Sequence, residues 1–159
     1  MKHLKTLFLA CIITFSLVSI GRTQDYDTGL GLRVGLYNGL TAKHFLGEKS
    51  ALEGIISMRW KGIGITGLYE LHNSLFNADG LKWYVGGGAH VGFYNGDHTE
   101  WGTPETKYRV MGLDGILGLE YSFNSFPISL SIDWKPAFNI VGYRGIWADE
   151  FALAMCYTF

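Results

Sequence analysis

Residues 151–159 alternate between large apolar and small side chains. Phe151, Leu153, Met155, Tyr157 and Phe159 form one face, while alanine, cysteine and threonine occupy the other. A period of two residues predicts a β-strand whose successive side chains point to opposite faces. A free strand with so apolar a face invites aggregation. A membrane barrel removes such an edge by pairing the last strand with the first, so the run predicts a closed barrel in a membrane.

The N-terminal segment has the form of a secretory signal peptide. A basic start, with Lys2 and Lys5, precedes a mainly apolar stretch over 7–20, and small side chains precede a cut before Gln24. This stretch is too short to span a membrane comfortably as a helix. The residues before Cys11 loosely resemble a lipidation box, but the apolar stretch continues past that cysteine. We therefore expect export with cleavage rather than lipidation.

Removal of residues 1–23 as a signal peptide leaves one barrel domain over 24–159. The cut removes three of the 13 Lys and Arg and none of the 14 Asp and Glu, so the exported chain carries a charge near −4. Without a basic tract, nucleic acid is not an expected partner. Cys156 becomes the only cysteine, which excludes an intrachain disulfide and a cysteine-based zinc site.

Eight segments show the alternation that is typical of strands. The fold class that we predict is all-β, an eight-stranded antiparallel up-and-down transmembrane β-barrel with apolar side chains outside, because an even number of strands is usual for such barrels. The second segment alternates least clearly. The eight segments cover residues 30–36, 40–45, 52–60, 63–72, 81–94, 110–121, 128–135 and 151–159.

The connections and aromatic residues predict an orientation. With the C-terminus in the periplasm, the loops 95–107 and 143–149 lie outside the cell, and the turns 73–80 and 124–127 lie inside. Two aromatic belts are expected where a membrane meets water, unless these rings form the core of a soluble protein. The inner belt would hold Trp83, Tyr121, Phe123, Phe126, Tyr157 and Phe159. The outer belt would hold Trp60, Phe93, Trp101 and Trp147.

The inward faces of the strands carry charges of both signs. An eight-stranded barrel is just wide enough for its own side chains, so these charges must pair in a plugged lumen. A wide pore would need more strands, although a narrow conducting path stays open as an alternative. The predicted lumen network consists of Arg33, Glu53, Arg59, Glu70, Lys82, Asp114, Glu120, Asp133 and Lys135.

The export segment, the glycine-rich strand 83–93 and the terminal Tyr157 and Phe159 together resemble the small eight-stranded outer-membrane β-barrel proteins of Gram-negative bacteria. The segments 68–73 and 81–88 are similar to uncharacterised barrels of the Bacteroidota type, which a cut before a glutamine also suits. The resemblance implies a place in the cell outer membrane, among its lipids. It also implies that Tyr157 and Phe159 act as the assembly signal that the barrel-assembly machinery reads.

Two other functions are open. Glu70, His72 and Ser74 could form the orienting acid, base and nucleophile of a barrel enzyme acting on lipid A, a deacylase. Ser74 falls, however, in a turn expected on the periplasmic side, away from the outer leaflet. A secreted lipocalin-like binder of an apolar ligand would instead turn the apolar faces inward. We expect a structural or loop-mediated binding role, with any extracellular ligand at the loop 95–107.

The remaining candidate residues for a metal, phosphate or partner site give only weak signals. His44, His90 and His98 lack the spacing of metal ligands. A cation could be held by Asp97, His98 and Glu100, which lie in one loop, but solvated loop charge is the simpler interpretation. Trp101 beside them could instead contact a partner or a glycan. The glycines of 86–88 are not a phosphate loop, because no helix follows, and they indicate close strand packing or curvature. We assign no catalytic, cofactor-binding or metal-ligating residue.

Overall fold

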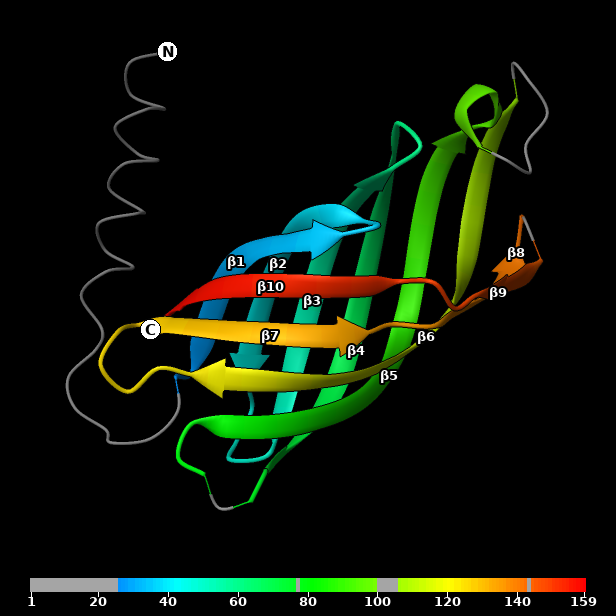
Figure 1. Ribbon diagram of the computed structural model, residues 1–159. Helices are drawn as coiled ribbons and strands as arrows, with labels where there is room; N and C mark the ends of the chain where they lie inside the picture. The colour runs from blue at the N-terminus through cyan, green and yellow to red at the C-terminus, as the bar shows by residue number, and fades with distance from the viewer. Residues whose placement is uncertain (1–25, 77, 100–105, 143) are drawn as a thin grey trace, which may run out of the picture.

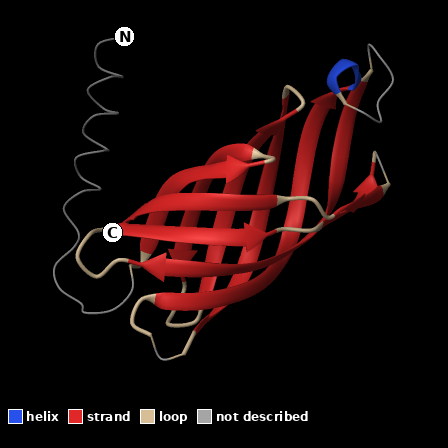
Figure 2. Ribbon diagram, in the orientation of Figure 1, coloured by secondary structure: helices blue, strands red, loops and turns tan. Residues whose placement is uncertain are grey.

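The computed structural model describes residues 26–76, 78–99, 106–142 and 144–159. The predicted signal peptide, Trp101 and Glu100 lie outside the described residues. Within the described ranges the chain is nearly all strand, with one short 3-10 helix at Gly96–His98 (Figure 2). No helix in these ranges is long and apolar enough to cross a membrane.

Ten strands make a single sheet. Eight of them form the barrel, and two short ones, β8 and β9, continue it at one end. The strands are β1 Thr28–Gly35, β2 Asn38–Phe45, β3 Ser50–Arg59, β4 Gly62–Ser74, β5 Leu81–Asn95, β6 Lys107–Ser122, β7 Ile128–Trp134, β8 Ala137–Val141, β9 Gly145–Trp147 and β10 Phe151–Thr158.

The sheet closes on itself. Neighbouring strands run antiparallel in the order β5, β4, β3, β2, β1, β10, β7, β6, and β6 then pairs with β5. The last strand lies between β1 and β7, with Leu32 opposite Met155 and Ile132 opposite Leu153. Figure 1 shows β10 in red beside the blue β1 and the yellow-orange β7. The prediction of an eight-stranded antiparallel barrel closed by its last strand is confirmed.

The two ends of the barrel carry different connections. We call the end that holds Phe159 and the turns after β2, β4 and β6 the C-terminal end. The other, distal end holds the turns after β1, β3 and β8 and the connection between β5 and β6. At this end β5 and β6 extend beyond the other strands (Figure 1). The predicted division of the long connections between the two ends is confirmed. The expected loop 143–149 is corrected in part, because β9 occupies Gly145–Trp147 and pairs with β8.

Apolar side chains point outward from every strand of the barrel. Leu32 is 56% exposed, whereas the neighbouring Arg33 is 1% exposed, and this alternation recurs around the sheet. We call the outward apolar surface the apolar belt. One exposed member from each barrel strand is Leu32, Leu40, Ile56, Ile65, Val85, Leu117, Ile132 and Leu153.

The weakly patterned second strand is regular in the structure. Thr41, Lys43 and Phe45 are buried, and Leu40 and His44 point outward. The sequence pattern is poor because this strand places an aromatic ring inside and a histidine outside. The inward orientation of Lys43 therefore could not be predicted from the types of the neighbouring residues.

Two tight turns differ from their predicted positions. Trp60 and Lys61 both have positive φ, 50° and 52°, and connect Arg59 to its partner Gly62. Two such residues form a type I′ hairpin turn, whose twist suits antiparallel strands. The expectation that Trp60 points outward from a strand is wrong, because it lies in this turn. The first hairpin turns at residues 36–37, whereas the predicted segments 30–36 and 40–45 leave 37–39 for this turn.

Glycines let backbone and rings approach closely at two places. A side chain at Gly88 on β5 would collide with the backbone carbonyl of Gly67 on β4. A side chain at Gly118 on β6 would collide with the ring of Tyr84, which fills the space left by the glycine. These contacts agree with the predicted close packing of the glycine-rich strand, which bends strongly in Figure 1.

The first prediction tests this close approach. Gly88→Ala should lower the free energy of unfolding by about 1–3 kcal/mol, the usual cost of overpacking, because the backbone of β4 must move. Gly67→Ala is the matched control, since a side chain there meets no atom within 4 Å. Denaturant titration followed by tryptophan fluorescence measures both, and equal stabilities would contradict the packing described.

Candidate functional site: the polar interior and distal mouth

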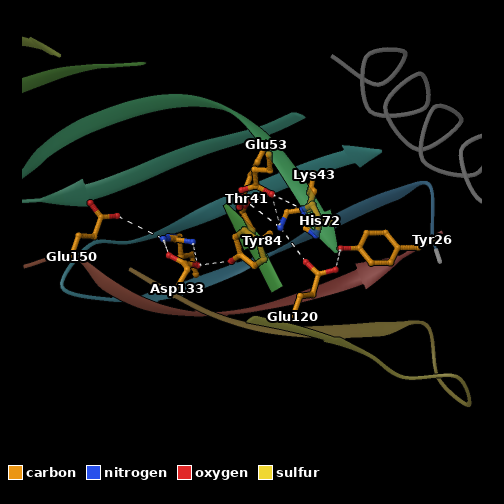
Figure 3. A network of polar contacts seen from close by, with 11 residues as sticks. Tyr26, Thr41, Lys43, Glu53, His72, Tyr84, Glu120, Asp133 and Glu150 are labelled. Atoms are coloured by element: carbon orange, nitrogen blue, oxygen red, sulfur yellow. Dashed lines mark hydrogen bonds and ion pairs between the residues drawn. The ribbon is translucent and has the colours of Figure 1, made fainter. Parts of the chain in front are cut away.

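The predicted lumen residues come together inside the barrel. Eight of the nine are buried, and Arg59 lies half-buried at the distal end. Two residues that the sequence did not single out, Lys43 and Glu150, join them and link their ion pairs. The contacts extend as a row from Tyr26 to Glu150 (Figure 3).

Lys43 is the centre of the first group. Its Nζ lies 3.0 Å from Glu70 Oε2, 3.0 Å from Glu120 Oε2 and 3.7 Å from Glu53 Oε2. The four side chains come from β2, β3, β4 and β6, so a single ammonium joins four strands of the barrel. Removing this cation would leave three buried carboxylates without their shared positive partner, which is costly in free energy.

Neighbouring groups hold the three carboxylates in place. The Tyr26 hydroxyl donates a 2.6 Å hydrogen bond to Glu120, and the Thr41 hydroxyl donates one to Glu53. His72 Nε2 lies 3.0 Å from Glu70 Oε2. The Tyr84 ring lies 4.3 Å from Lys43 Nζ, where its π-face meets the cation, and stacks on His72.

A second group occupies the middle of the lumen. Arg33 forms a two-pronged ion pair with Asp133, in which Nη1 donates to Oδ2 at 2.7 Å. The Tyr84 hydroxyl also donates to Asp133 Oδ2, at 3.1 Å, so Tyr84 connects this pair with Lys43. Tyr84 also belongs to a buried apolar cluster, which consists of Ile55, Leu68, Tyr84 and Ile116.

A third group lies toward the distal end. Lys135 Nζ is 2.9 Å from Glu150 Oε2 and 3.0 Å from Asp114 Oδ1. His90 lies between Asp114, at 2.8 Å, and Asn139, at 2.9 Å. Glu150 also approaches Arg33 at 3.9 Å, which links the third group to the second.

Aromatic rings gather at the distal mouth. The Arg59 guanidinium lies 4.6 Å from the Tyr37 ring centroid and 4.0 Å from that of Trp60, and it pairs with Asp149 at 3.3 Å. Burial raises the pKa of the Tyr37 phenol well above its usual range, so this group stays neutral beside the cation. The Trp147 ring contacts Trp60 at a centroid distance of 5.7 Å. Trp60 and Trp147, expected in an outer belt, thus meet each other at the mouth.

A small cavity lies beneath these rings. Its volume is about 20 Å³, enough for roughly one water molecule. Its lining includes the aromatic rings of Tyr94 and Trp147 and the charged side chains of Asp114, Lys135 and Glu150. The cavity offers polar partners to a small guest and no room for a lipid chain.

The hypothetical catalytic trio is divided between two environments. His72 is 1% exposed and contacts Glu70 inside the barrel, whereas Ser74 is exposed at the C-terminal end of β4. No group of three or more His, Cys, Asp or Glu side chains among the described residues is arranged to hold a metal ion. His98 is exposed in the short helix, and Glu100 lies outside the described ranges.

A sequence signal existed for Glu150, although not for Lys43. Glu150 shares the parity of Ala152 and Ala154, the inward residues of β10, so extending that strand by one residue would have found it.

Comparison of the chain with protein-family models, curated proteins and solved structures finds no match. The interpretation of the interior therefore rests on its geometry.

The second prediction concerns the central cation. Lys43→Met should cost about 3–5 kcal/mol in free energy of unfolding, because three buried carboxylates lose their shared partner. Adding Glu70→Gln and Glu120→Gln should recover much of this loss by removing unpaired charge. Lys49→Met, an exposed substitution in the β2–β3 turn, is the control. Chemical denaturation measures all three, and a Lys43→Met protein as stable as the control would contradict the assignment.

Proposed function

We propose that this chain is an integral outer-membrane β-barrel protein of a Gram-negative bacterium, with a filled polar lumen and a structural or loop-mediated binding role. One observation carries the proposal: a closed barrel has its charges inside and a continuous apolar belt outside. Soluble monomers rarely expose a contiguous apolar patch larger than about 300–600 Å². A lipid bilayer is the surrounding in which such a surface is stable.

The arrangement of charge argues against a lipocalin-like binder. The described interior is lined by ion pairs rather than by an apolar cavity, with Arg33, Lys43 and Lys135 at its centre. An apolar ligand would have to displace these pairs and leave charges uncompensated. The apolar surface that could meet lipid is on the outside instead.

A lipid A deacylase has no specific support in the geometry. The only histidine near Ser74 in the proposed trio is His72, which is held in the lumen by Glu70. Ser74 belongs to the C-terminal end, which the proposed orientation places in the periplasm. A non-enzymatic protein is the simpler proposal.

The orientation follows from the lengths of the connections. The connection between Asn95 and Lys107 belongs to the distal end, and outer-membrane barrels carry their longer loops outside the cell. We therefore propose that this loop is the place for any extracellular ligand. Tyr157 and Phe159, on and after β10, are proposed as the contact for the barrel-assembly machinery during insertion.

The third prediction tests which face meets lipid. In a Cys156→Ser background, Leu117→Cys places a thiol in the apolar belt, and Lys61→Cys places one in an exposed turn. In isolated outer membranes, a water-soluble maleimide should label the turn rapidly and the belt at least tenfold more slowly. Equal, rapid labelling of both thiols would show that the apolar belt is exposed to water and would contradict membrane insertion.

The fourth prediction tests the filled lumen. The purified protein in a planar lipid bilayer should show no steady conductance, because the ion pairs and the apolar cluster occupy the described interior. Arg33→Ala with Asp133→Ala removes the middle pair and should raise the frequency of channel openings. Steady openings of the unaltered protein would contradict a plugged barrel and support a conducting path.

A further inference from the structure

The two ends of the barrel differ in their exposed charge. Exposed cations stand at the distal end, where Lys61 lies in the β3–β4 turn and Lys107, Arg109 and Arg144 lie on or beside β6 and β9. At the C-terminal end, most of the exposed charged residues that the structure describes are acidic. They are Asp27, Glu48 and Asp79, with Lys49 as the cation among them. Among the described residues, the distal end therefore presents exposed cations to an external anion.

Three of these cations belong to paired parts of the sheet, two to β6 and one to the turn that follows its partner β8. Lys107 and Arg109 lie on the outward face of β6, four and two residues before the exposed Met111, respectively. Arg109 pairs with Phe93 of β5, and its backbone carbonyl lies where a side chain at Gly142, in the turn between β8 and β9, would collide with it. Arg144 belongs to the same turn. We call Lys107, Arg109 and Arg144 the rim cations.

The rim cations have no internal counter-ion among the described residues. Arg59, at the same end, pairs with Asp149 at 3.3 Å, but none of the rim cations forms an ion pair with a described residue. They are also continuous with the apolar belt, because Phe93, Met111 and Val141 lie next to them and are exposed. A ligand that complements both the rim cations and the apolar belt has an anionic head group and apolar chains.

We propose that the rim cations bind the phosphate groups of phosphorylated lipids in the leaflet that surrounds the distal end. This inference rests on the proposed membrane location. A guanidinium can donate two parallel hydrogen bonds to a phosphate, and basic residues at a membrane surface attract anionic lipid. The acyl chains of the same lipid would lie along Phe93 and Met111 of the apolar belt.

Lipid binding by purified protein tests the proposal. Diphosphorylated lipid A and the same lipid after dephosphorylation are titrated into the barrel in an uncharged detergent, and bound lipid is counted by native mass spectrometry. The unaltered protein should prefer the phosphorylated lipid about tenfold or more. Arg109→Gln with Arg144→Gln should reduce that preference by about tenfold and leave binding of the dephosphorylated lipid unchanged.

Two controls separate the causes of failure. Lys49→Gln removes a cation at the opposite end and should keep the full preference. Millimolar inorganic phosphate should fail to displace the lipid, and displacement would overturn a lipid site in favour of free phosphate. No phosphate preference, or a double variant that keeps it, also overturns the proposal. If the thiol in the apolar belt is labelled slowly but the protein shows no preference for phosphorylated lipid, only this inference fails. If that thiol is labelled as rapidly as the one in the turn, the proposed function fails as well.

Discussion

Closure of the sheet is the constraint on which the rest of the structure depends. β10 hydrogen-bonds to β1 on one side and to β7 on the other, and β5 pairs with β6 over fifteen opposed residues. A closed sheet satisfies its backbone donors and acceptors internally, which is what a barrel in lipid requires. Closure also gives the sheet an inside and an outside, so the period-two alternation separates charge from apolar surface.

The interior depends on a few shared groups rather than on isolated ion pairs. Lys43 joins three carboxylates, Tyr84 touches both Lys43 and Asp133, and Glu150 connects Lys135 with Arg33. Such a network ties together strands that are far apart in the sequence. Its members have few alternative partners in so narrow a space, so it also favours one register of the strands.

Much of the fold could be predicted from the sequence, because alternation and tight turns are local signals. Leu32 and Arg33 are neighbours with opposite character, and their facing was correct. Trp60 was misplaced because the alternation continues through it, although the chain turns there with positive φ. Lys43 was missed for a different reason: its role depends on Glu70 and Glu120, which closure brings near it and no local pattern reveals.

The central claim is that the apolar belt faces lipid. Cell fractionation combined with gel mobility tests it most directly, because folded membrane barrels keep their compact shape in cold detergent. The account predicts that the protein sediments with outer membranes, requires detergent for extraction, and migrates differently before and after boiling. A mature protein that stays monomeric and soluble without detergent would contradict it.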